Sequence, residues 1–580
     1  MIDENKVWEK GIDYPVWMTE PGIVTLKSGY IPDGYTPRTT MELVGRTVEL
    51  ELGIPNISDK VFKYLWEGYI GLSSPVWSNF GRKRGLPISC FNSHFSDSIL
   101  DFKKKDLEVA VMSKNGGGTS AYFGDVRGRG AIISDATAKA NGVMSPIKMV
   151  NNTIEEVSQG GVRRGMLAGY LDFSHPDITE FLDIREVGHD IQTITTGVII
   201  EKSDVDAIMT GDTKALDTWA KILEKRNNIG VPYIYFKDNC ENGLSTPEPY
   251  RKGGNYPLKS SNLCSEIILP SKKDESFVCC LLSMNLAKYD DWKNTDAVEV
   301  GAYILEAVLN EFIRKATKLE GMESAVLFAE RHRAIGIGTL GEHTYFQEKK
   351  MPFLSLTSEF HRKMMYKNIS DKAEKANIEL ADMFGPCEVN KEYGIHKRFT
   401  TTMAIAPTTT NALICGEVSP GIEALVSNVF QRKVAKGSFL GKNKFLVKLL
   451  RDKEQDTAIV WESIIDNFGS VQHLEFLTDD EKEVFLTAYE MNQFDLIKQA
   501  SVRQQYIDQA QSLNLFVLPN TSAQVRSDLY LTAYFTGVKT LYYQRSLSNL
   551  VEDKSVDDVN AYFNKVAVNA YDNGCSSCEG

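Results

Sequence analysis

The chain has 580 residues, of which 42% are hydrophobic and 24% charged, as in an ordinary water-soluble globular protein with room for several domains. Its formal net charge of −12 argues against a nucleic-acid polymer as partner, because proteins that bind such polymers carry a basic surface. No run approaches the roughly 18 apolar residues of a membrane span, and the polar start MIDENKVWEK is no signal peptide, so we expect a cytoplasmic protein.

Apolar β-rich runs alternate with amphipathic helices along the chain, without an internal repeat or a long linker. This alternation predicts an α/β protein, in which residues from about 70 to 560 form one large unit. In chain order, we expect a strand over 191–200, a helix near 215–225, a strand over 232–236, a helix over 302–315, a helix near 359–384, a strand over 401–406 and a helix near 478–500.

The segment SSNLCSEIILP carries an amide, a thiol and a carboxylate at alternate positions, Asn262, Cys264 and Glu266. In an extended segment, these three side chains point to the same side. A buried structural cysteine with two polar neighbours and a catalytic triplet both fit this pattern. The same two interpretations apply to the other cysteines in strand-like runs, which are Cys90 in LPISCFNSH and Cys279 with Cys280 in SFVCCLLSMNL.

The run PTTTNA places three hydroxyls and several free backbone amides ahead of an apolar stretch. It fits an anion cradle at a helix N-terminus. It fits equally well a plain helix cap made by Thr410 or Asn411.

Two adjacent tyrosines, Tyr542 and Tyr543, occur in TLYYQ. In a strand, adjacent side chains face opposite sides, which predicts one core ring and one surface ring. The other interpretation is a redox relay, in which phenols in contact pass an electron and a proton.

Nine cysteines are too sparse for a disulfide framework, and their odd number fits a reducing compartment in which particular thiols do chemistry. Two of them, Cys575 and Cys578, lie within the last six residues, in a tail that its glycines and serines make flexible. A pair of thiols on such a tail can travel to a distant site. A zinc-binding tail is the alternative, although only two ligands are visible where four are typical.

Together, these motifs resemble those of the large, catalytic subunit of class I ribonucleotide reductases. The resemblance extends from about residue 70 to the C-terminus and rests on SCFNSH, SQGGVRRG, SNLCSE, CLLSMNL, RAIGIGTLG, APTTT, GVKTLYYQ and the terminal cysteine pair, in the family's order. It implies a ten-stranded α/β barrel of the type shared with glycyl radical enzymes, with Cys264 at the tip of a finger loop through its centre. We expect a short helical N-terminal region over 1–70, the barrel over 71–564 and a flexible redox-active tail over 565–580.

The resemblance also implies a reaction, the reduction of ribonucleoside diphosphates to 2′-deoxyribonucleoside diphosphates for DNA precursor synthesis. Cys264 would carry a thiyl radical that removes the 3′ hydrogen. Glu266 would be the base on the 3′-hydroxyl, and Asn262 would hold the neighbouring sugar hydroxyl.

The family's active-site dithiol, which protonates the departing hydroxyl and becomes a disulfide, matches Cys90 and Cys279. Cys280 leaves this choice open, and we select Cys279 because it lies six residues before Asn285, as in the family. The tail pair would reduce the disulfide by thiol exchange and would itself be reduced by thioredoxin or glutaredoxin.

Tyr542 and Tyr543 match the stacked pair that receives the radical from a separate small subunit with a dimetal centre. No metal and no tightly bound cofactor are then expected on this chain. A cobalamin-dependent reductase is one alternative, against which the tyrosine pair argues, because such an enzyme makes its radical beside the substrate. A non-catalytic thiol or metal-binding protein is the other.

The remaining positions carried over concern nucleotides. Asp97 and Arg127 fall where the family binds its dNTP or ATP effector at the interface of a homodimer, and 185–192 resembles the loop that links this effector to base choice. The family's N-terminal ATP-cone is expected to be absent. The residues that match the binding site of the substrate diphosphate are Ser74, Ser89, Thr408, Thr409, Thr410 and Asn411.

Overall fold

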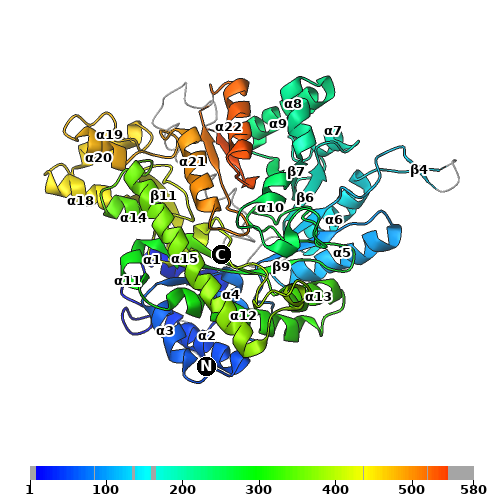
Figure 1. Cartoon of the computed structure of the whole chain (residues 1–580). Helices are drawn as coiled ribbons and strands as arrows, with labels where there is room; N and C mark the ends of the chain where they lie inside the picture. The colour runs from blue at the N-terminus through cyan, green and yellow to red at the C-terminus, as the bar shows by residue number, and fades with distance from the viewer. Residues whose placement is uncertain are drawn as a thin grey trace.

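A computed structural model describes residues 8–83, 85–133, 138–157, 165–434, 437–518 and 520–546 of the chain. Strands and helices alternate along much of this length, as the sequence predicts (Figure 1). The strands are β1 (Ile70–Leu72), β2 (Cys90–His94), β3 (Gly118–Tyr122), β4 (Ile132–Ile133), β5 (Ala138–Lys139), β6 (Leu167–Asp172), β7 (Ile194–Ile200), β8 (Tyr233–Phe236), β9 (Val278–Asn285), β10 (Ile335–Leu340), β11 (Val429–Val434), β12 (Gly437–Lys442), β13 (Leu515–Val517), β14 (Thr540–Leu541) and β15 (Gln544–Ser546).

Five parallel strands form one half of a barrel. They are β2, β3, β6, β7 and β8, each parallel to the next in this order. All residues of β2, β3, β7 and β8 are buried, and the sequences of β7 and β8 are accordingly almost without strongly polar residues. The strands predicted over 191–200 and 232–236 are β7 and β8.

The second half of the barrel contains five further segments, which are β9, β10, the run 403–405, the run from 511 to the end of β13, and the interrupted strand made of β14 and β15. β10 lies parallel to β9, and parallel bridges join Ile337 to Met403 and Ile405 to Gln511. The chain from Gln511 continues into β13, which lies parallel to β15. Antiparallel pairing of β2 with β9 and of β14 with β8 joins the halves. The predicted ten-stranded α/β barrel is therefore confirmed.

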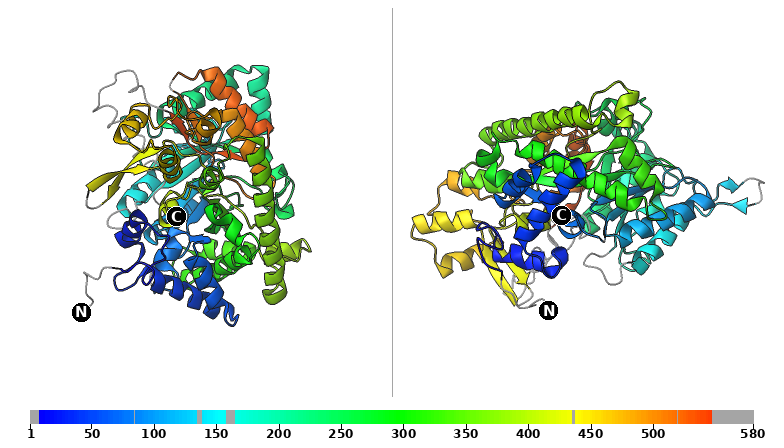
Figure 2. Two further views of the ribbon diagram at one scale, coloured as in Figure 1. Left: turned by 90° about the vertical axis from the view of Figure 1, so that its left-hand side faces the viewer. Right: turned by 90° about the horizontal axis from the view of Figure 1, so that it is seen from below.

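Helices cover the outside of the barrel, and the long α15 runs along one side of the molecule (Figure 2). No helix in the described ranges is long and apolar enough to cross a membrane. The helices are α1 (Glu20–Thr25), α2 (Pro37–Leu52), α3 (Ile57–Trp66), α4 (Ser74–Asn79), α5 (Ile99–Lys114), α6 (Met144–Val157), α7 (Ile178–Phe181), α8 (Lys202–Thr210), α9 (Thr213–Ile229), α10 (Lys237–Asn242), α11 (Tyr289–Trp292), α12 (Ala297–Ala316), α13 (Glu323–His332), α14 (Glu342–Glu348), α15 (Leu356–Phe384), α16 (Glu388–Glu392), α17 (Thr409–Ile414), α18 (Lys444–Asp452), α19 (Ala458–Asp466), α20 (Asp479–Val484), α21 (Gln493–Gln504) and α22 (Ala523–Phe535), with short turns η1 (Leu26–Tyr30), η2 (Glu248–Tyr250) and η3 (Leu286–Lys288).

One hydrophobic core extends from Met18 to Tyr543 and includes the N-terminal helices. Of these helices, α2 packs on α3 and on α12, which is buried along most of its length. A smaller core between Val429 and Phe485 lies under α18, α19 and α20, at the left edge of Figure 1. The N-terminal helices therefore share their core with the barrel.

Two predicted elements differ from the structure. The helix expected near 478–500 is two helices, α20 and α21, because Asn492 caps a new helix by accepting a hydrogen bond from the amide of Phe494. The run 401–406 makes only isolated bridges at Met403 and Ile405 and is no regular strand. Both differences arise from local capping and tertiary contacts that apolar periodicity does not report.

Gly197 on β7 provides a test of how tightly the barrel is packed. A Cβ at this position would overlap the ring of Tyr170 on β6, so Gly197→Ala should lower the free energy of unfolding by about 1–3 kcal/mol. The matched control is Gly301→Ala in α12, whose Cβ would meet Leu282 at an ordinary 3.4 Å. Denaturant unfolding of both variants checks this, and equal stabilities would contradict it.

Candidate active site at the centre of the barrel

A loop inside the barrel, the finger loop (residues 260–270), carries the predicted triplet. Every residue of this loop is buried. The hydroxyl of Tyr170, from the first half-barrel, donates to the carbonyl oxygen of Asn262 at 2.7 Å. The hydroxyl of Ser512, from the second half, donates to the carbonyl oxygen of Cys264, also at 2.7 Å. Both halves of the barrel therefore hold the tip of the loop.

The tip of the finger loop is a turn. Ser265 has φ 69°, in the left-handed region, and its amide donates to the carbonyl oxygen of Asn262 at 3.4 Å. The expectation of an extended segment, with alternate side chains on one side, is wrong at this point. A loop that enters the barrel and returns has to reverse direction, and the turn does so beside Cys264.

Thiols from three parts of the chain meet around the turn. Cys90 and Cys279 lie directly opposite each other in the antiparallel pairing of β2 with β9. The side-chain amide of Asn262 donates to Cys90 Sγ at 3.1 Å. The hydroxyl of Tyr542 donates to Cys264 Sγ at 3.5 Å. The structure thus brings together the finger loop, the seam between the half-barrels and the C-terminal strand.

Glu266 completes the cluster from the second half-barrel. Its carboxylate accepts a hydrogen bond from the hydroxyl of Ser512 at 3.2 Å, and its carbonyl oxygen accepts one from the amide of Ala510 at 2.9 Å. The residue is fully buried. A carboxylate in such a dry site can accept a proton at a defined position.

The adjacent thiols of β9 point in opposite directions. Cys280 Sγ lies 3.6 Å from the carbonyl oxygen of Leu305 on α12, outside the barrel. Cys279 lies on the side of Cys90, and burial, with the nearby Cys280, Cys90 and Glu266, raises its pKa well above the ordinary value. At neutral pH the Cys279 thiol therefore keeps its proton.

Tyr542 and Tyr543 lie where the strand is interrupted between β14 and β15. Their ring centroids are 4.4 Å apart, with 58° between the ring planes. The ring of Tyr233 on β8 packs against both, at 4.8 Å and 5.1 Å. Both tyrosines are buried, so the prediction of one core ring and one surface ring is wrong. The contacts instead run from Tyr543 through Tyr542 to Cys264.

Buried polar groups also gather at the start of α17. Thr408 precedes the helix with φ 56° and does not cap it; its hydroxyl accepts from the amide of Gly421 at 2.7 Å. A cap made by Thr410 or Asn411 is therefore not what forms. Asn411 Nδ2, close to Gly71 of β1, has no hydrogen-bond partner within the described ranges. Such a group calls for a ligand or water as its partner.

Two serines, Ser74 and Ser89, are also predicted to bind the substrate diphosphate. Ser74 begins α4, with one residue between it and the end of β1, and Ser89 directly precedes Cys90. Both are buried, and Ser89 Oγ finds no hydrogen-bond partner among the residues that the structure describes. Thr409 and Thr410 are half-buried in the first turn of α17. The structure therefore places most of this set on elements that adjoin β1 and the Cys90 strand.

The predicted effector residues form an ion pair at the surface. Arg127 Nε donates to the Asp97 carboxylate, and Arg127 also donates to the carbonyl oxygen of Ile132 at 3.0 Å. In the segment 185–192, Arg185 has φ 70° and donates to Thr195 on β7 at 2.8 Å. Residues 158–164 of SQGGVRRG, together with Cys575 and Cys578, lie outside the described residues.

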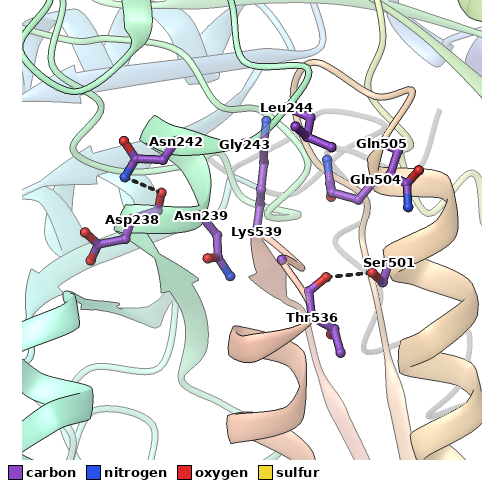
Figure 3. A pocket seen from close by; sticks show the side chains of 11 residues that line it. Asp238, Asn239, Asn242, Gly243, Leu244, Ser501, Gln504, Gln505, Thr536 and Lys539 are labelled. Carbon is purple, nitrogen blue, oxygen red and sulfur yellow. Dashed lines mark hydrogen bonds between the residues drawn. The ribbon is translucent and has the colours of Figure 1, made fainter.

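Sequence reasoning missed several residues around the site. Tyr170 and Ser512, which hold the finger loop, occur in no motif that separates them from ordinary core residues. A pocket of about 260 Å³ between α10, α21 and the turn before β14 was also missed (Figure 3). Lys539 lines it, and burial lowers the pKa of this lysine to about 8. Its lining includes none of the predicted site residues.

Comparisons with known proteins agree on the family. The family model "Ribonucleotide reductase, barrel domain" matches residues 88–211, 201–397 and 387–544. The large subunit of ribonucleoside-diphosphate reductase from Invertebrate iridescent virus 3 is 31% identical, over 96% of this chain and 98% of its own. The corresponding subunit of Caenorhabditis elegans is 28% identical, over 90% and 76%.

A solved structure is similar over nearly the whole fold. It is the class Id ribonucleotide reductase alpha subunit of Actinobacillus ureae, with a TM-score of 0.85 and 44% sequence identity, covering 92% of this chain and 98% of that one. The barrel, the buried cysteine on its central loop and these similarities lead to one conclusion. The chain belongs to the ribonucleotide reductase family, as a large subunit of class I.

Proposed function

We propose that the protein reduces ribonucleoside diphosphates to 2′-deoxyribonucleoside diphosphates by a thiyl-radical mechanism. The observation that carries this proposal is the convergence of Cys264, the facing cysteines Cys90 and Cys279, and the hydroxyl of Tyr542 in one buried cluster. Large-subunit relatives that match nearly the whole chain are named for this reaction. Its product would serve DNA precursor synthesis.

Cys264 and its neighbours on the finger loop act on the sugar. Loss of a hydrogen atom from the Cys264 thiol to the Tyr542 oxygen, 3.5 Å away, leaves a thiyl radical that removes the 3′ hydrogen of the ribose. Glu266 accepts the proton of the 3′-hydroxyl, and Asn262 orients the neighbouring hydroxyl. Because the loop is fully buried, water is kept from the radical.

The facing cysteines remove the 2′-hydroxyl. The raised pKa of Cys279 keeps a proton available, and this proton leaves with the hydroxyl as water. Cys90 and Cys279 then give two electrons to the sugar and form a disulfide, and the hydrogen of the Cys90 thiol takes the place of the lost hydroxyl on C2′. Glu266 returns its proton to the 3′ oxygen, and Cys264 returns the 3′ hydrogen atom and becomes a thiyl radical again. We infer that Cys575 and Cys578 reduce this disulfide by exchange and are reduced in turn by thioredoxin or glutaredoxin.

Further proposals concern the partners. A separate small subunit with a dimetal centre supplies the radical to Tyr543 and Tyr542. The substrate diphosphate binds the residues around β1 and α17, where Ser89 and Asn411 have buried groups that lack a partner in the described part of the chain. A dNTP or ATP effector binds near Asp97 and Arg127 in a homodimer.

A cobalamin-dependent reductase is the second candidate, and it is not favoured. The similar solved structure is a class I alpha subunit, and the packed pair of Tyr542 and Tyr543 fits a radical that arrives from outside the barrel. A non-catalytic thiol protein would need neither the finger loop nor the pair. Reduction of CDP by the chain alone, with the small subunit and with adenosylcobalamin separates the three.

Cys264→Ser should lower turnover by at least about a thousandfold, or about 4 kcal/mol of barrier, because the serine O–H bond is too strong to yield the radical. Nucleotide binding should be unchanged, since serine is nearly isosteric. Rates of CDP reduction and calorimetry with CDP check both parts. Turnover within about tenfold of the wild type would contradict the radical role.

The two thiols of β9 can be tested against each other. Cys279→Ser should stop repeated turnover, because it removes half of the dithiol. The turnover rate of Cys280→Ser should stay within about threefold of the wild-type rate, because the substitution changes one atom on the outer side of the barrel, away from the reaction. This corresponds to a change in the activation free energy of under about 1 kcal/mol. Steady-state rates decide this, and the opposite ranking would move the role to Cys280.

Tyr542→Phe should abolish reduction and cost at most about 1 kcal/mol of unfolding free energy, because it removes only the phenolic hydroxyl through which the relay passes the radical. The control is Tyr366→Phe on α15, which removes an equally buried hydroxyl bonded to Thr339 and Glu342. The free energy of unfolding of this control should fall by about 1 kcal/mol, and its activity should be unchanged. An active Tyr542→Phe variant would show that the pair is ordinary packing.

A further inference from the structure

The tyrosine pair depends on an irregular piece of backbone. In a continuous strand, Tyr542 and Tyr543 would face opposite sides of the sheet. Their rings instead lie 4.4 Å apart because the strand is interrupted between β14 and β15. Whatever holds this interruption also sets the distance between the two rings.

Two side chains supply hydrogen bonds in place of those that a neighbouring strand would supply to a regular strand. Of the four backbone polar groups of Tyr542 and Tyr543, the amide of Tyr542 and the carbonyl oxygen of Tyr543 bond to the segment 513–515, at 2.9 Å and 3.0 Å. The carbonyl oxygen of Tyr542 accepts from Arg226 NH1 at 3.0 Å. The amide of Tyr543 donates to Asn514 Oδ1, also at 3.0 Å. Buried backbone groups need such partners.

Arg226 is an unusual residue for this position. Arg226 lies on α9 and is fully buried. Within the described ranges, no carboxylate lies at ion-pair distance from its guanidinium, and the Nε and NH2 atoms of this group have no hydrogen-bond partner. NH1 also donates to the carbonyl oxygen of Pro232, and the guanidinium lies 4.8 Å from the ring centroid of Tyr530. Burying an unpaired charge is costly, and an apolar residue would fill the space at less cost.

Asn514 is fixed from its other end. Its Nδ2 donates to the carboxylate of Glu423, which leaves Oδ1 directed at the amide of Tyr543. Burial raises the pKa of Glu423 to about 7. The side chain of Asn514 is itself buried. Arg226 and Asn514 therefore hold the carbonyl and the amide of the one peptide group that joins the two tyrosines, through hydrogen bonds that no regular strand would supply.

We propose that Arg226 and Asn514 are positioning residues for radical transfer, which hold the interrupted strand so that Tyr542 and Tyr543 stay in contact. This rests on the proposed relay function of the pair. Hydrogen-atom and electron transfer between the rings need contact, and a displacement of about 1 Å can lower a rate about a hundredfold. Without the two side chains, the segment would relax toward an ordinary strand and the rings would part.

The first test compares three variants in the complex with the small subunit. Arg226→Met and Asn514→Leu should each lower kcat for CDP reduction by at least about a hundredfold, with KM for CDP unchanged. Arg226→Lys, which keeps a donor for the Tyr542 carbonyl, should recover at least about a tenth of the lost rate. Asn514→Leu changes the opposite side of the segment, so it stays informative if Arg226→Met folds poorly.

The second test locates the break in the relay. 3-Aminotyrosine is oxidised more easily than tyrosine, so it gives up one electron and one proton to the arriving radical and traps it, as electron paramagnetic resonance can detect. In the Arg226→Met background, the analogue at position 543 should trap the radical as it does in the wild-type background. The analogue at position 542 should trap at least about tenfold less.

The outcomes separate the inference from the proposed function. Equal trapping at position 542 in the Arg226→Met and wild-type backgrounds would leave Arg226 only a general role in folding and would overturn the positioning role. Trapping lost at both positions in the Arg226→Met background would also overturn it, because the defect would then lie before the pair. No trapping at either position in the wild-type background would refute the relay itself.

Discussion

The hydrogen bonds that hold the finger loop inside the barrel are the contacts on which the rest of the site depends. Tyr170 bonds the loop from the first half-barrel and Ser512 bonds it from the second. A loop with so many buried backbone groups is stable only when such partners are provided. The position of Cys264 is therefore set by both halves at once, and the proposed chemistry requires that the barrel be closed.

Much of the fold and of the site could be predicted from the sequence. The order of the cysteine and tyrosine motifs identifies the family resemblance, and continuous apolar runs such as 191–200 predict strands that are buried on both faces. The choice of Cys279 over Cys280 agrees with the geometry, since only Cys279 lies on the side of Cys90. These features are local in the chain, or they recur at a fixed spacing from a motif.

The features that could not be predicted depend on contacts between distant segments. The turn at Ser265 exists because the finger loop reverses inside the barrel, which no local pattern reports. The packed rings of Tyr542 and Tyr543 require side chains from α9 and from residue 514, and an alternation rule for strands gives the opposite answer. Similarly, the start of α17 is set by a bond between Thr408 and Gly421 rather than by a cap in its own sequence.

The place of Cys90 and Cys279 has a mechanical consequence. The two residues face each other across the antiparallel seam of β2 and β9, where one half-barrel meets the other. A disulfide formed there during turnover would link the two half-barrels covalently. It would also close a loop of the chain that contains the whole first half-barrel. Such a loop removes conformational freedom from the unfolded chain. The oxidised subunit would then resist unfolding and proteolysis better than the reduced one, so the supply of reductant would also govern the lifetime of the idle protein.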